Sequence, residues 1–178
     1  MSGHSHSHNI KRAKDSTDAK RAKEFTKILR LVIVAVKKGG GDPNSNPNLR
    51  LAIEKARGAN MPKENIDRAI NRALGVAGDG GEMYELRYEG YGPEGVALMI
   101  DVVTDNKNRT LAEVRQTLNK FGGSLGEPGC ASYIFGNDPR NPQFRIPVAD
   151  NIKNKILELV EELEDNDDVQ DIFHNLEE

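Results

Sequence analysis

Positively charged side chains are the residues whose types and spacing most clearly suggest chemistry in this chain. Residues 11–30 contain a dense group of them, namely Lys11, Arg12, Lys14, Lys20, Arg21, Lys23, Lys27 and Arg30. Lysine and arginine at this density suit contacts with phosphate groups, which give affinity for a nucleic acid without reading its base sequence. A solvated protein surface is the alternative interpretation, but the density of the segment favours binding.

The segment TDNKNRT, residues 104–110, is a second candidate because it lies between an apolar run and a helix-like pattern. Thr110 and Glu113 have the spacing of a capping box, so we expect a helix that begins with Thr110 as its N-terminal cap. The two asparagines of the segment, Asn106 and Asn108, are typical of turns.

Three cations near this predicted helix start are explained neither by a turn nor by a cap, and they are Lys107, Arg109 and Arg115. They place positive charge beside a helix N-terminus, where backbone N–H groups and the helix dipole also favour an anion. The segment is therefore either a turn with a cap or a loop that faces phosphate groups, and the sequence leaves both interpretations open.

Catalytic and metal-binding patterns are missing from the sequence. The single thiol, Cys130, falls in a predicted strand without a histidine nearby in sequence, which is typical of a core thiol rather than a nucleophile. The GGGD segment at 39–42 follows a helix pattern, whereas a phosphate-binding loop follows a strand. The carboxylates of residues 158–168 lack the spacing of a calcium loop. We therefore expect no enzyme activity, no metal site and no cofactor.

Opposite net charges divide the chain into two halves. Residues 1–75 contain 16 Lys and Arg against 7 Asp and Glu, a net charge of +9, whereas the rest contains 9 against 21, a net charge of −12. The division predicts a basic domain over residues 1–75, a glycine-rich linker over residues 76–82 and an acidic domain over residues 83–178. The basic half either binds a polyanion or neutralises the acidic half within one molecule.

The composition also restricts the location. One cysteine cannot form an internal disulfide, which suits a reducing compartment. No run approaches the ~18 apolar residues of a membrane span, and the N-terminal segment lacks the apolar region of a secretory signal. We expect a cytoplasmic protein that does not enter a membrane.

Apolar residues at helical spacing predict three helices in the basic half. The first carries the stripe Phe25, Ile28, Leu29, Val32 and Val36. It is expected to begin near residues 15–18 and to end at the glycines of residues 39–41. The second has Asn46 as its cap and Pro47 in its first position, and it ends near Gly58.

The third predicted helix begins in NMPK, residues 60–63, with Asn60 or a neighbour as its cap and Pro62 in its first turn. Three helices joined by Gly, Pro and Asn residues predict a small bundle. None of them shows the base-reading set of a helix-turn-helix protein, so no sequence specificity is predicted.

The acidic half reads as alternating strands and helices. The predicted strands span residues 83–90, 95–103, 130–135, 143–148 and 167–175, and the predicted helices follow residues 110 and 151. From Val96 onward this order is β-α-β-β-α-β, typical of a ferredoxin-like domain, with residues 83–90 as an extra edge strand. The fold class is therefore α+β, with a three-helix bundle before the ferredoxin-like domain.

Several segments together resemble the YebC/PmpR family, whose mitochondrial relatives include the translational activator of cytochrome c oxidase. The resemblance rests mainly on DAKRAKEFTK at 18–27, GGGDPNSNPNLR at 39–50, NMPKENIDRAI at 60–70, YEGYGPEGVA at 88–97, TDNKNRT at 104–110 and EDNDDVQDIFHN at 164–175. It implies a basic helical first domain, a mixed second domain and no enzymatic activity. It also implies nucleic-acid contacts by residues 11–30, by the NMPK turn with Asn60, Met61 and Lys63, and by the TDNKNRT loop.

Two departures from the family pattern stand out. Where the family has a Lys-Trp pair, this chain has His6-Ser7-His8, and it contains no tryptophan at all. The third domain of the family is expected between residues 136 and 143, where this chain has only the short segment GNDPRNP. A hairpin loop can replace an inserted domain without cutting the core sheet.

Three functions fit these observations. A ribosome-associated translation factor would use the basic domain to bind ribosomal RNA by its backbone and shape. A transcriptional regulator would place the same surface on DNA. A protein–protein adaptor would match its cations to acidic groups of a partner. The missing groove-reading pattern favours RNA or the ribosome, and we expect a monomer.

Overall fold

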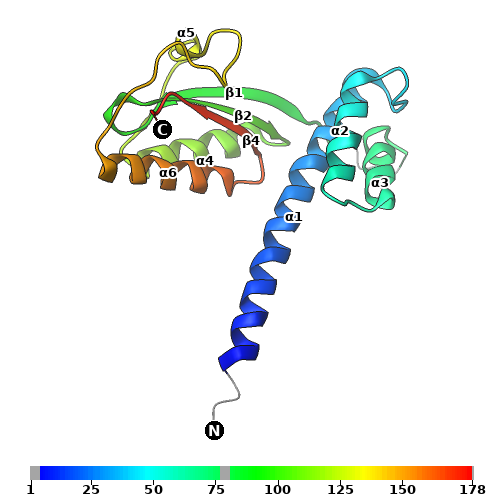
Figure 1. Cartoon of the computed structure of the whole chain (residues 1–178). Coiled ribbons are helices and arrows are strands. Elements are labelled where there is room, and N and C mark those ends of the chain that lie inside the picture. Colours follow the sequence, from blue (N-terminus) through cyan, green and yellow to red (C-terminus); the bar gives the residue numbers. More distant parts are fainter. Residues whose placement is uncertain (1–4, 77–80, 178) are drawn as a thin grey trace. The chain divides into compact units, whose positions relative to one another are not determined.

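The computed structural model describes residues 5–76 and 81–177, with side chains described from Thr17 onward (Figure 1). The chain divides into two compact units, Met1–Gly80 and Gly81–Glu178. Residues 77–80 of the predicted linker lie outside the described residues. The mixed α+β class predicted from the sequence is confirmed, because the first unit is helical and the second contains a four-stranded sheet.

Helix α1 spans Ser5–Gly39 and therefore begins about three turns earlier than the sequence predicted. The expected cap residues 15–18 lie inside the helix because the lysine, arginine and alanine residues on both sides favour helix strongly. The predicted end is confirmed: the N–H of Gly40 donates to the carbonyl of Val36 at 2.7 Å, and Gly40 adopts a positive φ that a glycine tolerates.

Helix α2 spans Pro47–Gly58, with Asn46 as its cap, as predicted. The Asn46 carboxamide oxygen accepts from the N–H of Leu49 at 3.1 Å, and its Nδ2 donates to the carbonyls of Ala35 and Gly40, each at 2.8 Å. One buried side chain thus starts α2 and also satisfies carbonyls at the end of α1.

Helix α3 spans Lys63–Ala73, and of the two alternatives predicted for its cap, Asn60 or a neighbour, Asn60 is wrong. Pro62 occupies the cap position without a side-chain hydrogen bond, whereas Asn60 has a positive φ and its N–H donates to the carbonyl of Arg57. Asn60 is used to end α2, so it cannot also start α3. Helices α2 and α3 pack on α1 through a core that includes Ile28, Val32, Val36, Leu49, Ala52, Ala56, Ile66 and Ala69.

The second unit is built on an antiparallel sheet with the strand order β3-β1-β2-β4. Its strands are β1 (Tyr84–Tyr91), β2 (Ala97–Thr104), β3 (Ser124–Leu125) and β4 (Val169–His174), and a short turn of 3-10 helix, η1 (Pro93–Gly95), joins β1 to β2. Helices α4 (Lys107–Lys120) and α6 (Asp150–Glu164) lie together along one face of the sheet (Figure 1).

Strand β2 is buried on both faces of this sheet. Its side chains at Leu98, Ile100 and Val102 pack with apolar residues of α4 and α6. Ala97 and Met99 point to the other face, where they pack with the short helix α5 (Ser132–Phe135). The alternation follows from the two-residue period of a strand, and it explains why β2 reads as a continuous apolar run.

Two of the predicted strands are wrong. Residues 130–135 lead into α5, and residues 143–148 form no strand, with only an isolated bridge from Ile146 to Leu176. Strand β1, predicted at an edge, lies between β2 and β3. Because β1 is antiparallel to both, β2 and β3 run in the same direction with β1 between them. The split β-α-β arrangement of a ferredoxin-like sheet is therefore present, and it is formed by β2, α4 and β3. The strand inserted between β2 and β3 is β1, which comes before this unit in the sequence, whereas in a ferredoxin-like domain the inserted strand comes after it.

The carboxylate of Glu89 explains why residues 130–135 form a helix. Its oxygens accept from the N–H groups of Gly129, Ala131 and Ser132 at 2.7–3.0 Å and from the Ser132 hydroxyl at 2.6 Å. Burial raises the pKa of Glu89, but these hydrogen bonds outweigh it and hold the pKa below its ordinary value. A buried anion from β1 thus caps α5, which local strand propensity does not reveal.

Candidate nucleic-acid interface

Four basic residues of α1 occupy one side of the helix. Lys20, Lys23, Lys27 and Arg30 recur at intervals of three and four residues, which places them along one face. Lys20 is exposed, whereas the other three are half-buried. The backbone of Lys11, Arg12 and Lys14 lies in the same helix, and their side chains are outside the described part of the chain.

Arg21 connects this helix to the NMPK turn. Its Nη2 donates to the carbonyl of Asn60 at 3.5 Å, and its guanidinium lies 5.2 Å from the ring centroid of Phe25. Two segments that the sequence singled out separately, residues 11–30 and residues 60–63, are therefore adjacent. They are 39 positions apart at this contact, so no local pattern could have predicted it.

The three predicted contact residues of the NMPK turn differ in accessibility. Asn60 and Lys63 are exposed, whereas Met61 is buried with Ile28, Ala56 and Ile66. Met61 is thus a core residue that fixes the turn, and Lys63 is the cation that the turn presents.

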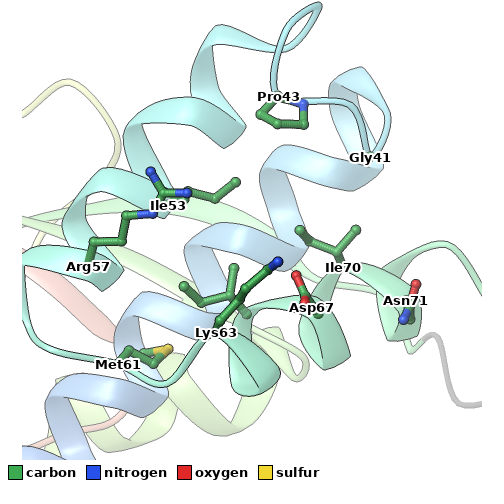
Figure 2. Close-up of a pocket in the computed structure, with 10 residues that line it drawn as sticks. Gly41, Pro43, Ile53, Arg57, Met61, Lys63, Asp67, Ile70 and Asn71 are labelled. Atoms are coloured by element: carbon green, nitrogen blue, oxygen red, sulfur yellow. The ribbon is translucent and has the colours of Figure 1, made fainter.

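An open cleft of about 560 Å³ lies between α2, α3 and the loop that follows α1. Arg57 borders it from α2, Asp67 and Ile70 border it from α3, and Lys63 lies between them (Figure 2). The lining is completed by Gly41, Pro43, Ile53, Met61, Ile66 and Asn71. Of this set, only Met61 and Lys63 were predicted from the sequence, although Arg57 and Lys63 are two cations on either side of one short turn, a pattern that the sequence shows.

The TDNKNRT loop begins α4 differently from the prediction. Asn106 is the cap and accepts from the N–H of Arg109 at 3.1 Å, so the proposed capping box at Thr110 is wrong. Thr110 lies buried inside the helix, where its hydroxyl contacts Thr104 and Asp168. Glu113, the other half of the proposed box, accepts from the amide of Asn166 at 2.7 Å. Both residues join α4 to the segment between α6 and β4.

Arg109 binds carboxylates of its own domain. Its Nη2 lies 2.8 Å from Oδ2 of Asp168 and 2.8 Å from Oδ1 of Asp105. Hydrogen bonds to Asp168, and then to Asp105, raise the pKa of the guanidinium. The positive charge that the sequence placed at this helix start is compensated within the second unit, which favours the structural interpretation of the loop for this residue.

The remaining predicted residues of the loop are on the surface. Asn108 and Arg115 are exposed, and so is Lys107, whose ammonium lies 4.0 Å from the ring centroid of Tyr84. Lys107 combines a cation with an aromatic face, a pair of groups that can meet a phosphate and a base.

Within the described residues no group of three or more His, Cys, Asp or Glu side chains is arranged to hold a metal ion. Over the same part of the chain, no helix has the length and apolar character needed to cross a membrane. Cys130 is half-buried, and burial raises the pKa of its thiol, which disfavours the reactive thiolate.

Comparison with known proteins gives a consistent result over most of the chain. Residues 5–76 match the family model described as the TACO1/YebC protein N-terminal domain. Residues 83–140 match the model described as the TACO1/YebC second and third domain. A crystal structure of a conserved hypothetical protein, Aq1575 from Aquifex aeolicus, is 33% identical with a TM-score of 0.81, over 90% of this chain and 91% of that chain.

Two curated relatives show how the chain differs in length. The probable transcriptional regulatory protein YrbC of Bacillus subtilis is 56% identical over 135 residues, which cover 76% of this chain and only 56% of that protein. The probable transcriptional regulatory protein GK2594 of Geobacillus kaustophilus is 40% identical over 243 positions, which cover all of this chain and 98% of that protein. Because this chain has 178 residues, about 65 of those positions (243 minus 178) have no counterpart here.

The two family models together match well over half of the chain, and a full-length relative exceeds 30% identity. The chain therefore belongs to the TACO1/YebC family.

Proposed function

We propose that this chain is a non-enzymatic regulator of gene expression that binds nucleic acid through its helical unit. The observation that carries the proposal is the contact of Arg21 with Asn60, which places the basic helix α1 beside the turn that presents Lys63. The first 75 residues of the chain carry a net charge of +9. A surface of this kind suits a polyphosphate chain, which it would bind with little sequence preference.

Structured RNA of the ribosome is the target that we favour, with the protein acting in translation in the cytoplasm. None of the described helices of the basic unit carries a set of base-reading side chains like that of a helix-turn-helix protein. Folded RNA is bound mainly by backbone and shape, which the cations of α1 can do.

A DNA-binding transcriptional regulator is the second candidate. It is favoured by the names of the Bacillus and Geobacillus relatives, both of which are called probable transcriptional regulatory proteins. Phosphate contacts do not distinguish DNA from RNA, so the same residues would serve either target.

Sedimentation of the full chain with purified ribosomal subunits tests the proposal. We expect co-migration with a subunit at low salt and release as the salt concentration rises. A tight shift of promoter DNA at physiological salt, without ribosome binding, would favour the second candidate. Failure to bind either nucleic acid at low salt would refute nucleic-acid binding.

We also propose that this chain lacks the third domain of its longer relatives. The unmatched positions of GK2594 and the end of the second family match at residue 140 fit the absence of the inserted third domain between residues 136 and 143. In this structure, α5 ends at Phe135, and Gln143 returns to it, since its N–H donates to the carbonyl of Ile134 at 2.8 Å. The two ends of the proposed deletion are therefore close enough for a short connection.

A further inference from the structure

The cleft of the helical unit has a floor and a rim of different chemistry. The floor is aliphatic and is formed by Ile53, Met61, Ile66 and Ile70. The rim carries two cations, Arg57 and Lys63, and two groups that can hydrogen-bond a ligand, Asp67 and Asn71 (Figure 2). Its volume of about 560 Å³ falls in the range of small-molecule sites.

The rim cations have no assigned role in holding the fold. Neither Arg57 nor Lys63 forms an ion pair with another described side chain, although both border the same opening. Two cations beside an apolar floor suit a ligand that is both anionic and flat, because the floor excludes water from a ring while the rim holds a phosphate.

We propose that this cleft receives one unstacked guanine of a single-stranded RNA segment, a proposal that rests on the nucleic-acid binding put forward above. The base would lie on the aliphatic floor, where apolar side chains can replace its stacking neighbours. Arg57 and Lys63 would hold the flanking phosphates. The carboxylate of Asp67 would accept from the two adjacent N–H donors on the Watson–Crick edge of guanine.

The carboxylate selects the base. Guanine offers two neighbouring donors to the two oxygens of a carboxylate, whereas uracil offers one donor between two acceptors. Adenine offers a donor beside an acceptor. A single well-placed bidentate pair discriminates between bases by about tenfold or more. An acidic side chain is otherwise unfavourable at a phosphate-binding surface, so its presence in the cleft is informative.

Fluorescence anisotropy with labelled RNA twelve-mers tests this site in the full chain. The probes are oligouridine, the same strand with one central guanine, and the same strand with one central adenine. We expect the guanine strand to bind about tenfold more tightly than the other two at one fixed salt concentration. In Asp67→Asn this preference should disappear, while oligouridine binds as tightly as before or more tightly because a negative charge has been removed.

Glu64→Gln is the matched control, since Glu64 is an exposed residue of the same helix outside the cleft, and its replacement removes the same charge. It should keep the guanine preference. A preference that survives Asp67→Asn, or that is equally lost in Glu64→Gln, would overturn the assignment to the cleft. Circular dichroism and thermal melting of both variants establish that the bundle is folded.

The results of this experiment distinguish a failure of guanine recognition from a failure of nucleic-acid binding. Equal binding of all three strands by the native chain would overturn guanine recognition and leave phosphate binding intact. No binding of any strand, of folded ribosomal RNA or of duplex DNA would refute both. Competition by free guanosine monophosphate at the same concentration as the guanine strand would show a mononucleotide site and contradict a site for RNA.

Discussion

The guanidinium of Arg109 is held 2.8 Å from the carboxylate of Asp168, a side chain that is only 3% exposed. The same carboxylate oxygen accepts from the hydroxyls of Thr104 and Thr110, so the start of α4, the end of β2 and the start of β4 meet at one anion. Removing a partner from such a group leaves a buried charge with weaker compensation.

We therefore expect Arg109→Ala to destabilise the second unit by about 1–2 kcal/mol. The expected loss is at the lower end for a charged hydrogen bond, because 41% of the arginine side chain is exposed and water screens the ion pair. Urea denaturation of the two proteins measures the difference. Lys107→Ala is the control and should change the stability of the second unit by less than about 0.5 kcal/mol. In a separate measurement of RNA affinity, a loss in Lys107→Ala but not in Arg109→Ala would assign the binding role of the loop to Lys107.

The Asn46 side chain makes three hydrogen bonds, one to the first turn of α2 and two to carbonyls at the end of α1. Asn46→Ala removes the cap of α2 and leaves the carbonyls of Ala35 and Gly40 without this donor, so we expect a loss of about 2 kcal/mol or more in the stability of the helical unit. Thermal and denaturant unfolding measure it. Asn44→Ala, at an exposed position of the same loop, should cost much less. Equal losses in the two variants would contradict the role of Asn46.

Glu89 gives the second unit a stability that depends on pH. Its pKa is lower in the folded chain than the ordinary value of 4.5. As the pH falls, the unfolded chain therefore binds this proton first, and stability is lost progressively from about pH 4.5 downward. We expect Glu89→Gln to be less stable than the native chain at neutral pH and to lose less stability on acidification. Parallel slopes of unfolding free energy against pH for the two proteins would contradict this account.

The basic face of α1 can be tested against an equal change of charge elsewhere. Lys20→Glu with Lys23→Glu should weaken RNA binding by at least about tenfold at low salt, because two phosphate contacts are lost and two repulsions are introduced. Arg140→Glu with Lys155→Glu changes the net charge by the same amount in the second unit, at exposed residues. Similar losses in both pairs would show that net charge, and not the α1 face, determines affinity.

The helical unit was largely predictable because its information is local. The apolar stripe of α1, the Asn46-Pro47 start of α2 and the glycines at 39–41 each determine structure within a few residues. The start of α1 was misplaced because good cap residues inside a strongly helical sequence do not interrupt the helix.

The second unit was less predictable because distant residues decide its local structure. Residues 130–135 have strand propensity, but Glu89, more than 40 positions earlier, binds their N–H groups and starts a helix there. The predicted cap of α4, Thr110, lies inside the helix and hydrogen-bonds to Asp168, 58 positions away, while Asn106 forms the cap.

The candidate site was also predictable only where its information is local. The cations were identified individually, but the contact of Arg21 with Asn60 and the cleft between Arg57 and Asp67 depend on how the helices pack. Arg109, for which the sequence left a phosphate-facing role open, is bound by Asp168 and Asp105.

The salt dependence of binding to a folded ribosomal RNA fragment tests the central claim most directly. If the basic face of α1 and the NMPK turn bind phosphates, the logarithm of the association constant will fall steeply and linearly with the logarithm of the salt concentration. The slope will correspond to several released counterions, and it will be smaller for Lys20→Glu with Lys23→Glu. A flat salt dependence, or an unchanged slope in that variant, would contradict the claim that this surface holds a polyphosphate chain.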